Sequence, residues 1–523
     1  MQRRLFLLNA ARLAAAASSV AHAAPSNSAG YPFSLGVASG SPLPDSVILW
    51  TRILPDPLNA HSSPPLAMPL RWEVADDEAF RRVVAKGSAI ATPELAHSVR
   101  VNVTGLQPAR WYFYRFLYGD AVSPVGRTRT APAAGSMPDM LKLAVASCQH
   151  WEFGSYAAHR YIAQAAPDLV AFLGDYIYEW GAYHLQHPAR AVRQDESFTL
   201  DDYRRRYAQY KTDPDLQAAH LAAPWIVTWD DHEVANDYAN DRDERLSPTF
   251  AQRRASAYQA FYEHMPLRLP PPNSFARVRM FQRVDWGRLA RFHVLDDRQY
   301  RAYEACPRPG RGGSNSVTPR TCPLLLDPRR SMLGAEQESW LAAGVSTSRA
   351  RWNVLAQQTL MASSSQVAPD GPEGGRYWTD GWDGYPMARQ RLLDTLAASG
   401  AANPLVLGGD VHTFYATELR RDFARPVSRA NPVVATEFVG TSVTSSSRPQ
   451  QRTLDYVAMN PHIKYGRSDK RGYMFFEITP REARVRCMGL DEVRNPGTPQ
   501  RVLAAFRVAD GRAGVEMTEV SQD

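Results

Sequence analysis

Short apolar runs alternate with longer amphipathic stretches over most of the chain. Runs of four to six residues at 141–146, 169–173, 225–228 and 404–407 are almost free of charge and have the length of buried strands. Between and after them, aromatic and aliphatic residues recur at helical spacing in 200–220, 248–264, 334–343 and 387–398. This alternation predicts an α/β domain of stacked sheets and helices.

The residues before the first of these runs have a different pattern. Apolar and polar positions alternate over 31–132, with turn residues at intervals typical of a β-sandwich. Leu106-x-Pro108-x-x-x-Tyr112-x-Tyr114 resembles the end of a fibronectin III-like domain. We therefore expect an N-terminal β-sandwich domain at 30–132, a Pro/Ala/Gly linker at 130–137, a catalytic domain at 138–489 and a strand-containing C-terminal extension at 490–523.

Metal-binding side chains directly follow four of the apolar runs. The segments are Ser147-Cys148-Gln149-His150, Gly174-Asp175-Tyr176-Ile177-Tyr178, Asp230-Asp231-His232-Glu233-Val234-Ala235-Asn236 and Gly409-Asp410-Val411-His412. Loops at the carboxyl ends of strands converge in open sheets. Four consecutive ionisable residues would be costly to bury unless they are paired or metal-bound, although an exposed helix N-terminus carrying acids is the alternative. One metal site built from four loops is the simplest interpretation.

The ligand types indicate two different ions. Thiolate, phenolate, carboxylate and imidazole suit a strongly Lewis-acidic transition ion, and the anionic Cys and Tyr donors favour Fe3+. Asp231, Asn236 and Asp410 offer only oxygen, which suits a harder cation such as Ca2+, Mg2+ or Mn2+. Asp175 has a position from which it could bridge both. Two adjacent ions generate a hydroxide nucleophile and stabilise the attacking and leaving oxygens of an in-line displacement.

The same segments resemble the metallophosphatase blocks G-D-x-x-Y, G-N-H-E and G-H-x-H, with two ligand substitutions. Those substitutions are similar to the PhoD-type alkaline phosphatases, as are further motifs at 147–149, 229–233, 295–301 and 382–386. The resemblance extends over residues 31–489. It implies a metallophosphatase-like αββα sandwich and a metal-dependent phosphoric ester hydrolase.

The resemblance also implies how the metals are held. The iron ligands would be Cys148, Asp175, Tyr178 and His412, and the calcium ligands Asp175, Asn236 and Asp410. Asp231 is either a direct ligand or only the counterpart of a ligand in the wider superfamily. Gln357 stands where that superfamily has the histidine of a V-x-x-H block, so the second metal should be harder than iron or zinc.

Two further residues are candidates for catalysis. Arg298 follows the strand-like run 289–295 and could bind phosphate in a bidentate manner, whereas a structural pair with Asp296 or Asp297 is the competing interpretation. His232 could protonate the leaving oxygen or bind phosphate. Alternatively, it only fixes the position of Asp231.

The first 23 residues indicate an export signal. Gln2-Arg3-Arg4-Leu5-Phe6 matches a twin-arginine signal, and an Ala-rich stretch and the cleavage-like Ala21-His22-Ala23 follow. We expect a periplasmic or secreted protein that uses the twin-arginine translocase, with a Sec signal as the alternative. Arg12 interrupts the apolar run and no other run has the roughly 18 apolar residues that span a bilayer, so no transmembrane segment is expected.

Composition and cysteine content add little. The chain is 44% hydrophobic with a net charge of +7, and no basic cluster with interleaved aromatics supports a nucleic-acid-binding module. If Cys148 binds metal, Cys306 and Cys322 could close one Pro/Gly/Arg-rich loop as a disulfide, and Cys487 is expected to be a buried free thiol. The loop would either overhang the site or be a surface excursion.

These observations predict a secreted alkaline phosphatase that acts on phosphomonoesters and on phosphodiesters, with small-molecule or lipid phosphate esters as substrates. A phospholipase D-like or other phosphodiesterase is the alternative within the same fold. A non-catalytic surface-binding protein on a decayed phosphatase fold and an iron oxidoreductase are the alternatives outside it. The completeness of the ligand set argues against decay, and an oxygen-only second site has no role in redox chemistry.

Overall fold

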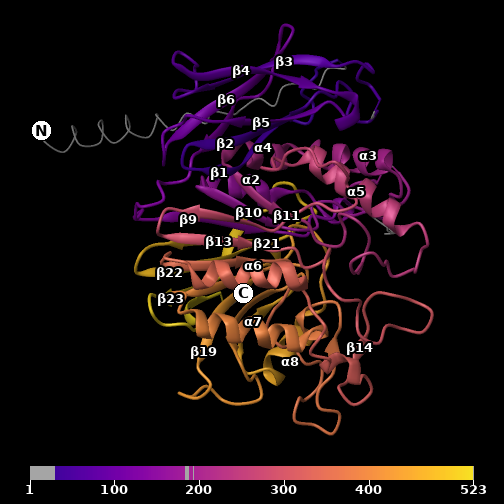
Figure 1. Cartoon of the computed structure of the whole chain (residues 1–523), viewed down its shortest axis with the longest axis vertical. Coiled ribbons are helices and arrows are strands. Elements are labelled where there is room, and N and C mark those ends of the chain that lie inside the picture. The colour runs from indigo at the N-terminus through magenta and orange to yellow at the C-terminus, as the bar shows by residue number, and fades with distance from the viewer. Residues whose placement is uncertain (1–29, 60, 183–187, 193, 522–523) are drawn as a thin grey trace, which may run out of the picture.

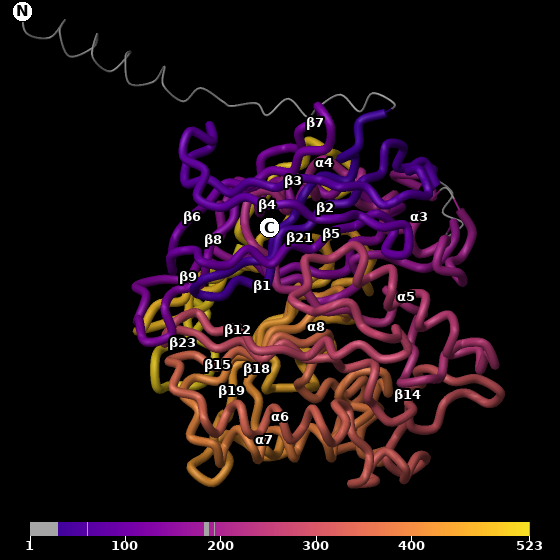
Figure 2. Tube along the Cα trace, turned by 45° about the horizontal axis from the view of Figure 1, so that its top comes forward, coloured from indigo at the N-terminus to yellow at the C-terminus, as the bar shows by residue number. Residues whose placement is uncertain are grey.

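A computed structural model describes residues 30–59, 61–182, 188–192 and 194–521. The expected signal peptide at 1–23 lies outside the described residues. The chain is built in stacked layers, with β3, β4 and β6 at one end (Figure 1). Figure 2 shows α6 and α7 near the opposite end.

A ten-stranded sheet forms the first central layer. Its order is β24-β23-β22-β21-β9-β10-β11-β1-β2-β5, and β9, β10 and β11 run parallel at its centre. Its strands are β1 (Val37–Leu43), β2 (Ser46–Arg52), β5 (Ser98–Val103), β9 (Leu141–Ala146), β10 (Leu169–Leu173), β11 (Trp225–Thr228), β21 (Arg471–Ile478), β22 (Glu482–Leu490), β23 (Gln500–Ala509) and β24 (Glu516–Val520). Because β23 pairs with β22, the residues after Gly489 continue this sheet.

A seven-stranded sheet forms the second central layer. Its order is β12-β13-β15-β17-β19-β18-β20, in which β13, β15, β17 and β19 are parallel neighbours. Its strands are β12 (Gln282–Trp286), β13 (Ala290–Val294), β15 (Trp352–Ala356), β17 (Pro404–Gly408), β18 (Phe414–Arg420), β19 (Val433–Val439) and β20 (Ile463–Arg467). The apolar runs therefore form the parallel centres of two sheets, as their uniform hydrophobicity predicts.

Alternate side chains of each strand enter different cores. Leu143 and Val145 of β9 face the second sheet and pack with residues such as Phe292 and Leu405, whereas Ala144 and Ala146 face the first helix layer. On the far side of the second sheet, Val406 packs against α6 and α7. This helix–sheet–sheet–helix arrangement confirms the predicted αββα sandwich.

The helices cover the outer faces of the sheets. They are α2 (Ala157–Ala165), α3 (Leu200–Lys211), α4 (Pro214–Ala222), α5 (Phe250–His264), α6 (Gly334–Ser346), α7 (Pro386–Ser399) and α8 (Gln450–Met459), with 3-10 turns η1 (Pro93–Leu95), η2 (Trp151–Phe153), η3 (Pro323–Leu326) and η4 (Trp382–Gly384). The single helix expected at 200–220 is wrong. Asp213 caps a new helix by accepting a hydrogen bond from the Leu216 amide at 2.9 Å, and Pro214 occupies its first turn. In the described part of the chain, no helix has the length and hydrophobicity to cross a membrane.

The N-terminal strands form a sandwich that shares a sheet with the rest of the chain. A five-stranded sheet packs on β1, β2 and β5 through one apolar cluster. Its strands are β3 (Met68–Ala75), β4 (Val83–Ala91), β6 (Trp111–Tyr118), β7 (Ala121–Val122) and β8 (Gly126–Arg129). Gly40 of β1 pairs with Trp225 of β11, and a Cβ at Gly40 would lie 2.6 Å from the Trp225 carbonyl oxygen. The sandwich is thereby joined directly to the layer that carries the metal-binding loops.

Cys306 and Cys322 form a disulfide. The loop between them contains β14 (Ser316–Val317), which pairs with β16 (Tyr377–Trp378), and its Ser314 amide donates to Asp237 Oδ2 at 3.1 Å. Since Trp378 and Asp237 line the main cavity, this loop supports the cavity wall. Cys487 is a free thiol buried between the two sheets, as expected.

Candidate metal centre

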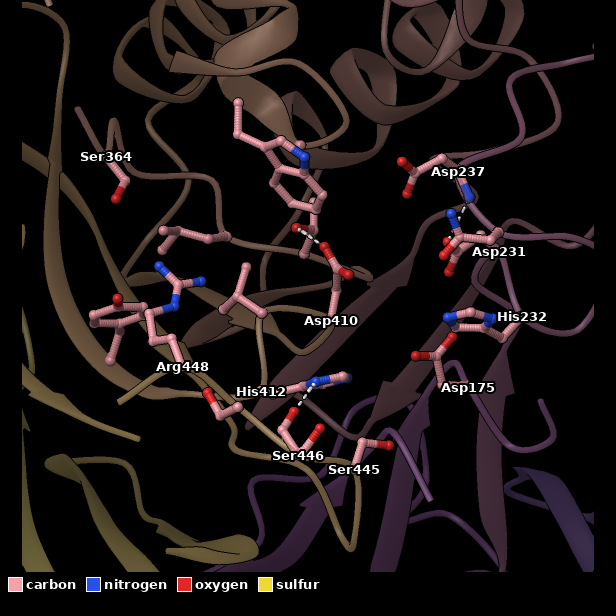
Figure 3. A pocket seen from close by; sticks show the side chains of 18 of the residues that line it. Asp175, Asp231, His232, Asp237, Ser364, Asp410, His412, Ser445, Ser446 and Arg448 are labelled. Atoms are coloured by element: carbon pink, nitrogen blue, oxygen red, sulfur yellow. Dashed lines mark hydrogen bonds between the residues drawn. The ribbon is translucent and has the colours of Figure 1, made fainter. Parts of the chain in front are cut away.

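The predicted ligand loops meet at one edge of the two central sheets. A cavity of about 490 Å³ opens there, beyond the carboxyl ends of parallel strands of both sheets. Seven of the nine predicted site residues line it: Asp175, Tyr178, Asp231, His232, Asn236, Asp410 and His412. Figure 3 shows these acids and histidines from three different loops pointing into a common space. Cys148 and Arg298 do not line the cavity and are buried behind its wall.

Four of the predicted ligands have a left-handed backbone. The φ angles are +61° at Cys148, +57° at Asp175, +60° at Asp410 and +53° at His412. The glycine before two of them is required by space. A Cβ at Gly174 would lie 2.4 Å from the Asp230 Cβ, and one at Gly409 would lie 2.4 Å from the Ser147 Oγ. The G-D motifs thus allow two strands to end in sharp turns that aim a carboxylate inward.

The four residues expected to hold iron lie together. Single ligand atoms of Cys148, Asp175 and His412 are all within 4.8 Å of one another. The Tyr178 hydroxyl donates to Asp175 Oδ2 at 2.8 Å and lies 3.3 Å from His412 Nε2. His412 Nδ1 is 2.6 Å from the Ser446 carbonyl oxygen, so its Nε2 is the nitrogen that faces the centre. A thiol, a carboxylate, a phenol and an imidazole therefore surround one point.

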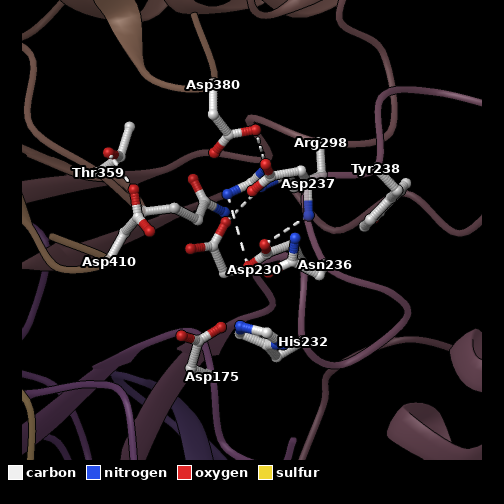
Figure 4. Close-up of polar contacts among 12 residues, drawn as sticks. Asp175, Asp230, His232, Asn236, Asp237, Tyr238, Arg298, Thr359, Asp380 and Asp410 are labelled. Atoms are coloured by element: carbon white, nitrogen blue, oxygen red, sulfur yellow. Dashed lines mark hydrogen bonds and ion pairs between the residues drawn. The ribbon is translucent and has the colours of Figure 1, made fainter. Parts of the chain in front are cut away.

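A second group shares Asp175 with the first. Ligand atoms of Asp175, Asp231 and His232 also lie within 4.8 Å of one another. Asp410 accepts a hydrogen bond from the Thr359 hydroxyl at 2.5 Å, and Asn236 directs its amide nitrogen to Glu244 at 3.4 Å. Figure 4 shows Asp410 and Asn236 on either side of Asp230, with Asp175 and His232 below them. The side chains with oxygen donors, Asp175, Asp231, Asn236 and Asp410, thus line the cavity.

Arg298 bridges carboxylates instead of facing the cavity. Its Nε contacts Asp230 Oδ1 at 2.5 Å, its Nη1 contacts Asp380 Oδ1 at 2.7 Å, and its Nη2 lies 3.6 Å from Asp231 Oδ1. The side chain is 1% exposed. Neither Asp296 nor Asp297 forms an ion pair with its guanidinium among the described residues, although the Arg298 amide donates to Asp296 Oδ1. The geometry therefore favours a structural bridge over a phosphate contact, but with partners other than those considered from sequence.

The carboxylates are crowded in a buried space. Burial raises the pKa of Asp230 to about 6 and that of Asp237 to about 8. Burial, reinforced by neighbouring acids, also raises the pKa values of Asp175 and Asp410 well above their usual range. At Asp231, burial acts in the same direction, but the positive charges of Arg298 and His232 overcome it and lower the pKa.

The crowding fits a cation. Asp175 Oδ1 and Asp231 Oδ1 are buried without a hydrogen-bond partner among the described residues. Burial raises the pKa of the Cys148 thiol, as it does for the Tyr178 phenol, so neither would ionise at neutral pH without a positive charge nearby. A metal ion would supply that charge and satisfy the unpaired oxygens. The donor set could hold metal, with sulfur and nitrogen donors in one group and mainly oxygen donors in the other.

Gln357 has no free oxygen to offer as a ligand. It is buried, and its Oε1 accepts hydrogen bonds from the Thr359 amide and the Trp382 indole, each at 3.1 Å. Its role here is to fix the turn after β15 and the aromatic wall of the cavity.

Several supporting residues were not singled out from sequence. Glu233 accepts backbone hydrogen bonds from Asp175, Tyr176 and Asp230, and so ties two ligand loops together. Glu179 accepts from His232 Nδ1 and from the Asn236 amide, both at 2.7 Å. The sequence marked Glu233 only as part of an acidic run, and nothing local distinguished Glu179.

Comparison with known proteins identifies the family. A model described as "PhoD-like phosphatase" matches residues 143–487, and one described as "PhoD-like phosphatase, N-terminal domain" matches residues 16–132. Alkaline phosphatase D of Bacillus subtilis (strain 168) is 43% identical over 502 residues, which is 94% of this chain and 83% of that protein. A solved structure titled "Structure of PhoD" superposes with a TM-score of 0.89 at 41% identity, covering 95% of this chain and 94% of the other.

The chain therefore belongs to the PhoD-like phosphatase family. The family assignment confirms the resemblance predicted from the sequence and, with it, a phosphoric ester hydrolase.

Proposed function

We propose that this PhoD-like phosphatase is an exported alkaline phosphatase that hydrolyses phosphomonoesters and phosphodiesters with Fe3+ and Ca2+ at the site described above. The observation that carries the proposal is the convergence of Cys148, Asp175, Tyr178 and His412 on one point beside an oxygen-only group. In this assignment Cys148, Asp175, Tyr178 and His412 hold iron. Asp175, Asn236 and Asp410 hold calcium, and Asp231 is placed to join them.

The metals and the protein have separate tasks. When bound, such ions lower the pKa of water and stabilise negative charge on the phosphoryl group. The chain orients the substrate and moves the proton. In hydrolysis a P–O bond forms to the oxygen of water, the P–O bond to the alcohol breaks, and the alcohol oxygen must gain a proton.

His232 is the proposed proton donor. Its Nδ1 donates to Glu179 at 2.7 Å, so Nε2 is the nitrogen that, when the ring is protonated, can give a proton to the leaving oxygen. Although burial opposes the charged form, Asp231 and Glu179 raise the pKa of His232 above its usual range. Its ring also stacks on Tyr178, with the ring centroids 4.2 Å apart, which limits its rotation.

Arg298 is proposed as a positioning residue for Asp230 and Asp231, on the strength of its burial and its carboxylate partners. The twin-arginine pair Arg3-Arg4 supports export to the periplasm or beyond. The proposed domain limits are 30–132 for the sandwich, 138–489 for the catalytic domain and 490–523 for the C-terminal extension. The two family models, at 16–132 and 143–487, support the first two limits, and β23 and β24 of the third segment continue the ten-stranded sheet.

Metal analysis paired with ester assays tests the proposal. Protein isolated after native export should contain iron and calcium and should cleave 4-nitrophenyl phosphate and bis(4-nitrophenyl) phosphate. EGTA should remove activity and leave iron in place, because oxygen ligands exchange calcium readily, and Asp410→Asn should increase the calcium needed for recovery. The variant Asp370→Asn, which changes an exposed acid outside the cavity, is the control. An active protein that lacks iron, or one insensitive to EGTA, would contradict the assignment.

A phosphodiesterase specific for lipid headgroups remains the second candidate. It is favoured by the apolar and aromatic residues of the cavity, including Leu360, Trp378 and Trp382. Substrate assays with monoesters, simple diesters and phospholipid headgroup esters separate the two.

A further inference from the structure

The cavity continues past the metal-binding loops to a basic end. Arg448 and Arg452 line it together with Tyr456 of α8. In Figure 3, Arg448 lies across the cavity from Asp231 and His232, with Asp410 and His412 between them. The acidic and the basic side chains of the same cavity are therefore separated.

The two arginines are not neutralised by the protein. Within the described ranges, neither Arg448 nor Arg452 has an ion pair. Arg452 Nε donates to the Tyr456 hydroxyl at 3.0 Å, and the Arg448 guanidinium carbon lies 5.2 Å from the centroid of the Tyr456 ring. The aromatic ring holds the guanidinium groups in place while leaving their N–H donors available. Arg448 is half-buried and Arg452 is exposed, so both guanidinium groups are accessible to a ligand in the cavity.

The wall of the cavity carries apolar surface beside its polar side chains. Leu360 and Val411 lie on it, and Trp378 and Trp382 add aromatic surface. Such a wall suits the carbon skeleton of an ester, not a bare anion. The cavity thus offers a site for a phosphoryl group, apolar and aromatic surface for an organic spacer, and two guanidinium groups without carboxylate partners among the described residues.

We propose that Arg448 and Arg452 form a distal anion subsite, which selects phosphate esters whose leaving group carries a second phosphate group. The inference rests on the proposed function, because the reacting phosphoryl group is assumed to occupy the loops around Asp175. A guanidinium presents two parallel N–H donors to a phosphate, which fixes both distance and orientation. The second phosphate would restrict how deeply the ester enters and so place its other end at the reacting position.

Matched substrates test the subsite. The probes are the monophosphates and the bisphosphates of a series of straight-chain diols of increasing length, which differ only in the distal phosphate. The metal-loaded wild-type protein should prefer the bisphosphate at an intermediate chain length by about tenfold in kcat/KM, after correction for its two equivalent esters. Charge-assisted hydrogen bonds contribute enough for an effect of this size.

Substitutions locate the effect. Arg448→Gln with Arg452→Gln should remove the bisphosphate preference mainly through KM and should leave hydrolysis of the monophosphates within about twofold of wild type. Arg448→Lys should retain part of the preference that Arg448→Gln loses, because lysine keeps the positive charge but lacks the two parallel N–H donors of a guanidinium. Arg429→Gln removes the same charge from an exposed position outside the cavity and should change nothing. Melting temperatures of all variants establish that they are folded.

Two results would refute the distal subsite. The subsite is refuted if wild type shows no chain-length-dependent preference, or if the double variant loses monophosphate and bisphosphate hydrolysis equally, which would place the arginines at the reacting phosphate. Calorimetric binding of the corresponding alkane bisphosphonates and monophosphonates, which cannot be hydrolysed, separates this from the proposed function. If the bisphosphonate binds in an arginine-dependent manner but no ester is hydrolysed, the subsite is kept and the proposed function is rejected. If esters are hydrolysed but the bisphosphonate binds no better than the monophosphonate, the proposed function is kept and the subsite is rejected.

Discussion

Substitution of Arg298 by methionine should destabilise the protein and disorder the carboxylate side of the metal centre. Methionine fills a similar volume but leaves Asp230 Oδ1 with no partner, since the Arg298 Nε is its only hydrogen-bond donor in the described part of the chain. Asp380 is less affected because Arg301 Nη2 also contacts it at 2.6 Å. The loss is therefore concentrated on Asp230, next to the proposed ligand Asp231.

The expected magnitude follows from burial. Asp230 and Arg298 are each 1% exposed, so removing one partner leaves an uncompensated buried charge, at a cost of roughly 3–5 kcal/mol. With an unfolding entropy of about 2.1 cal/mol/K per residue, that cost lowers the melting temperature of a chain of this length by roughly 3–5 °C. Metal content should fall as well, because the Asp231 turn loses its neighbour.

Thermal unfolding, metal content and ester hydrolysis should be measured on one preparation of Arg298→Met. Arg115→Met is the matched control, because it breaks a half-exposed pair with Glu73 at 2.7 Å that is expected to contribute below about 1 kcal/mol. Adding Asp230→Asn to Arg298→Met should recover part of the melting temperature by removing the stranded charge. A variant with unchanged melting temperature and metal content, but with kcat/KM lower by about a hundredfold, would show that Arg298 contacts the phosphate instead.

Three further predictions concern other parts of the chain. Iron-loaded wild type should be coloured by charge transfer from its phenolate and thiolate, and Tyr178→Phe or Cys148→Ser should shift or abolish that band in the visible spectrum. Burial lowers the pKa of Lys211 from 10.5 to about 7. Since the unfolded chain keeps this proton up to the higher value, the contribution of Lys211 to stability should rise with pH between the two values, by up to about 5 kcal/mol, and be constant below pH 7. Lys211→Met should remove that rise in urea unfolding at pH 7, 8.5 and 10, and an unchanged pH profile would refute it. Arg3→Lys with Arg4→Lys should leave the precursor in the cytoplasm, whereas undiminished periplasmic activity would indicate the Sec route.

The central strands could be predicted from the sequence because their composition is uniform. Residues 141–146, 169–173 and 225–228 are apolar on both faces, as strands covered by layers on each side must be, and the structure begins and ends them at the same positions. The helix at 200–220 failed because periodicity was followed past Asp213-Pro214, although a capping aspartate before a proline is a local start signal. The joining of β1 to β11 had no local signal, since one strand pair links segments far apart in the chain.

Some residues of the candidate site could likewise be predicted from the sequence, and others could not. The proposed ligand positions Asp175 and Asp410 could be predicted to lie in the cavity because a buried strand and a glycine precede each of them. Asp380 was not, because it reaches the centre from an irregular segment after β16 and is recognised only by its contacts with Arg298 and Arg301. Glu179 and Glu233 were missed as supports because a carboxylate that accepts backbone hydrogen bonds cannot be distinguished, in sequence, from one that faces solvent.

The left-handed ligand positions indicate that the protein, and not the metal, determines the shape of the centre. A non-glycine residue in that conformation costs roughly 1 kcal/mol or more, and four proposed ligands adopt it. The turns are held by one another: the Cys148 amide donates to the Gly174 carbonyl at 3.1 Å, and the Gln149 amide donates to the Asp175 carbonyl at 3.0 Å. Backbone hydrogen bonds between the loops therefore fix the strained turns. The carboxylates that face the cavity repel one another, and a bound cation would relieve that repulsion. An ion that fits this arrangement binds without reorganising the turns, which favours selection by donor type and position over selection by affinity alone.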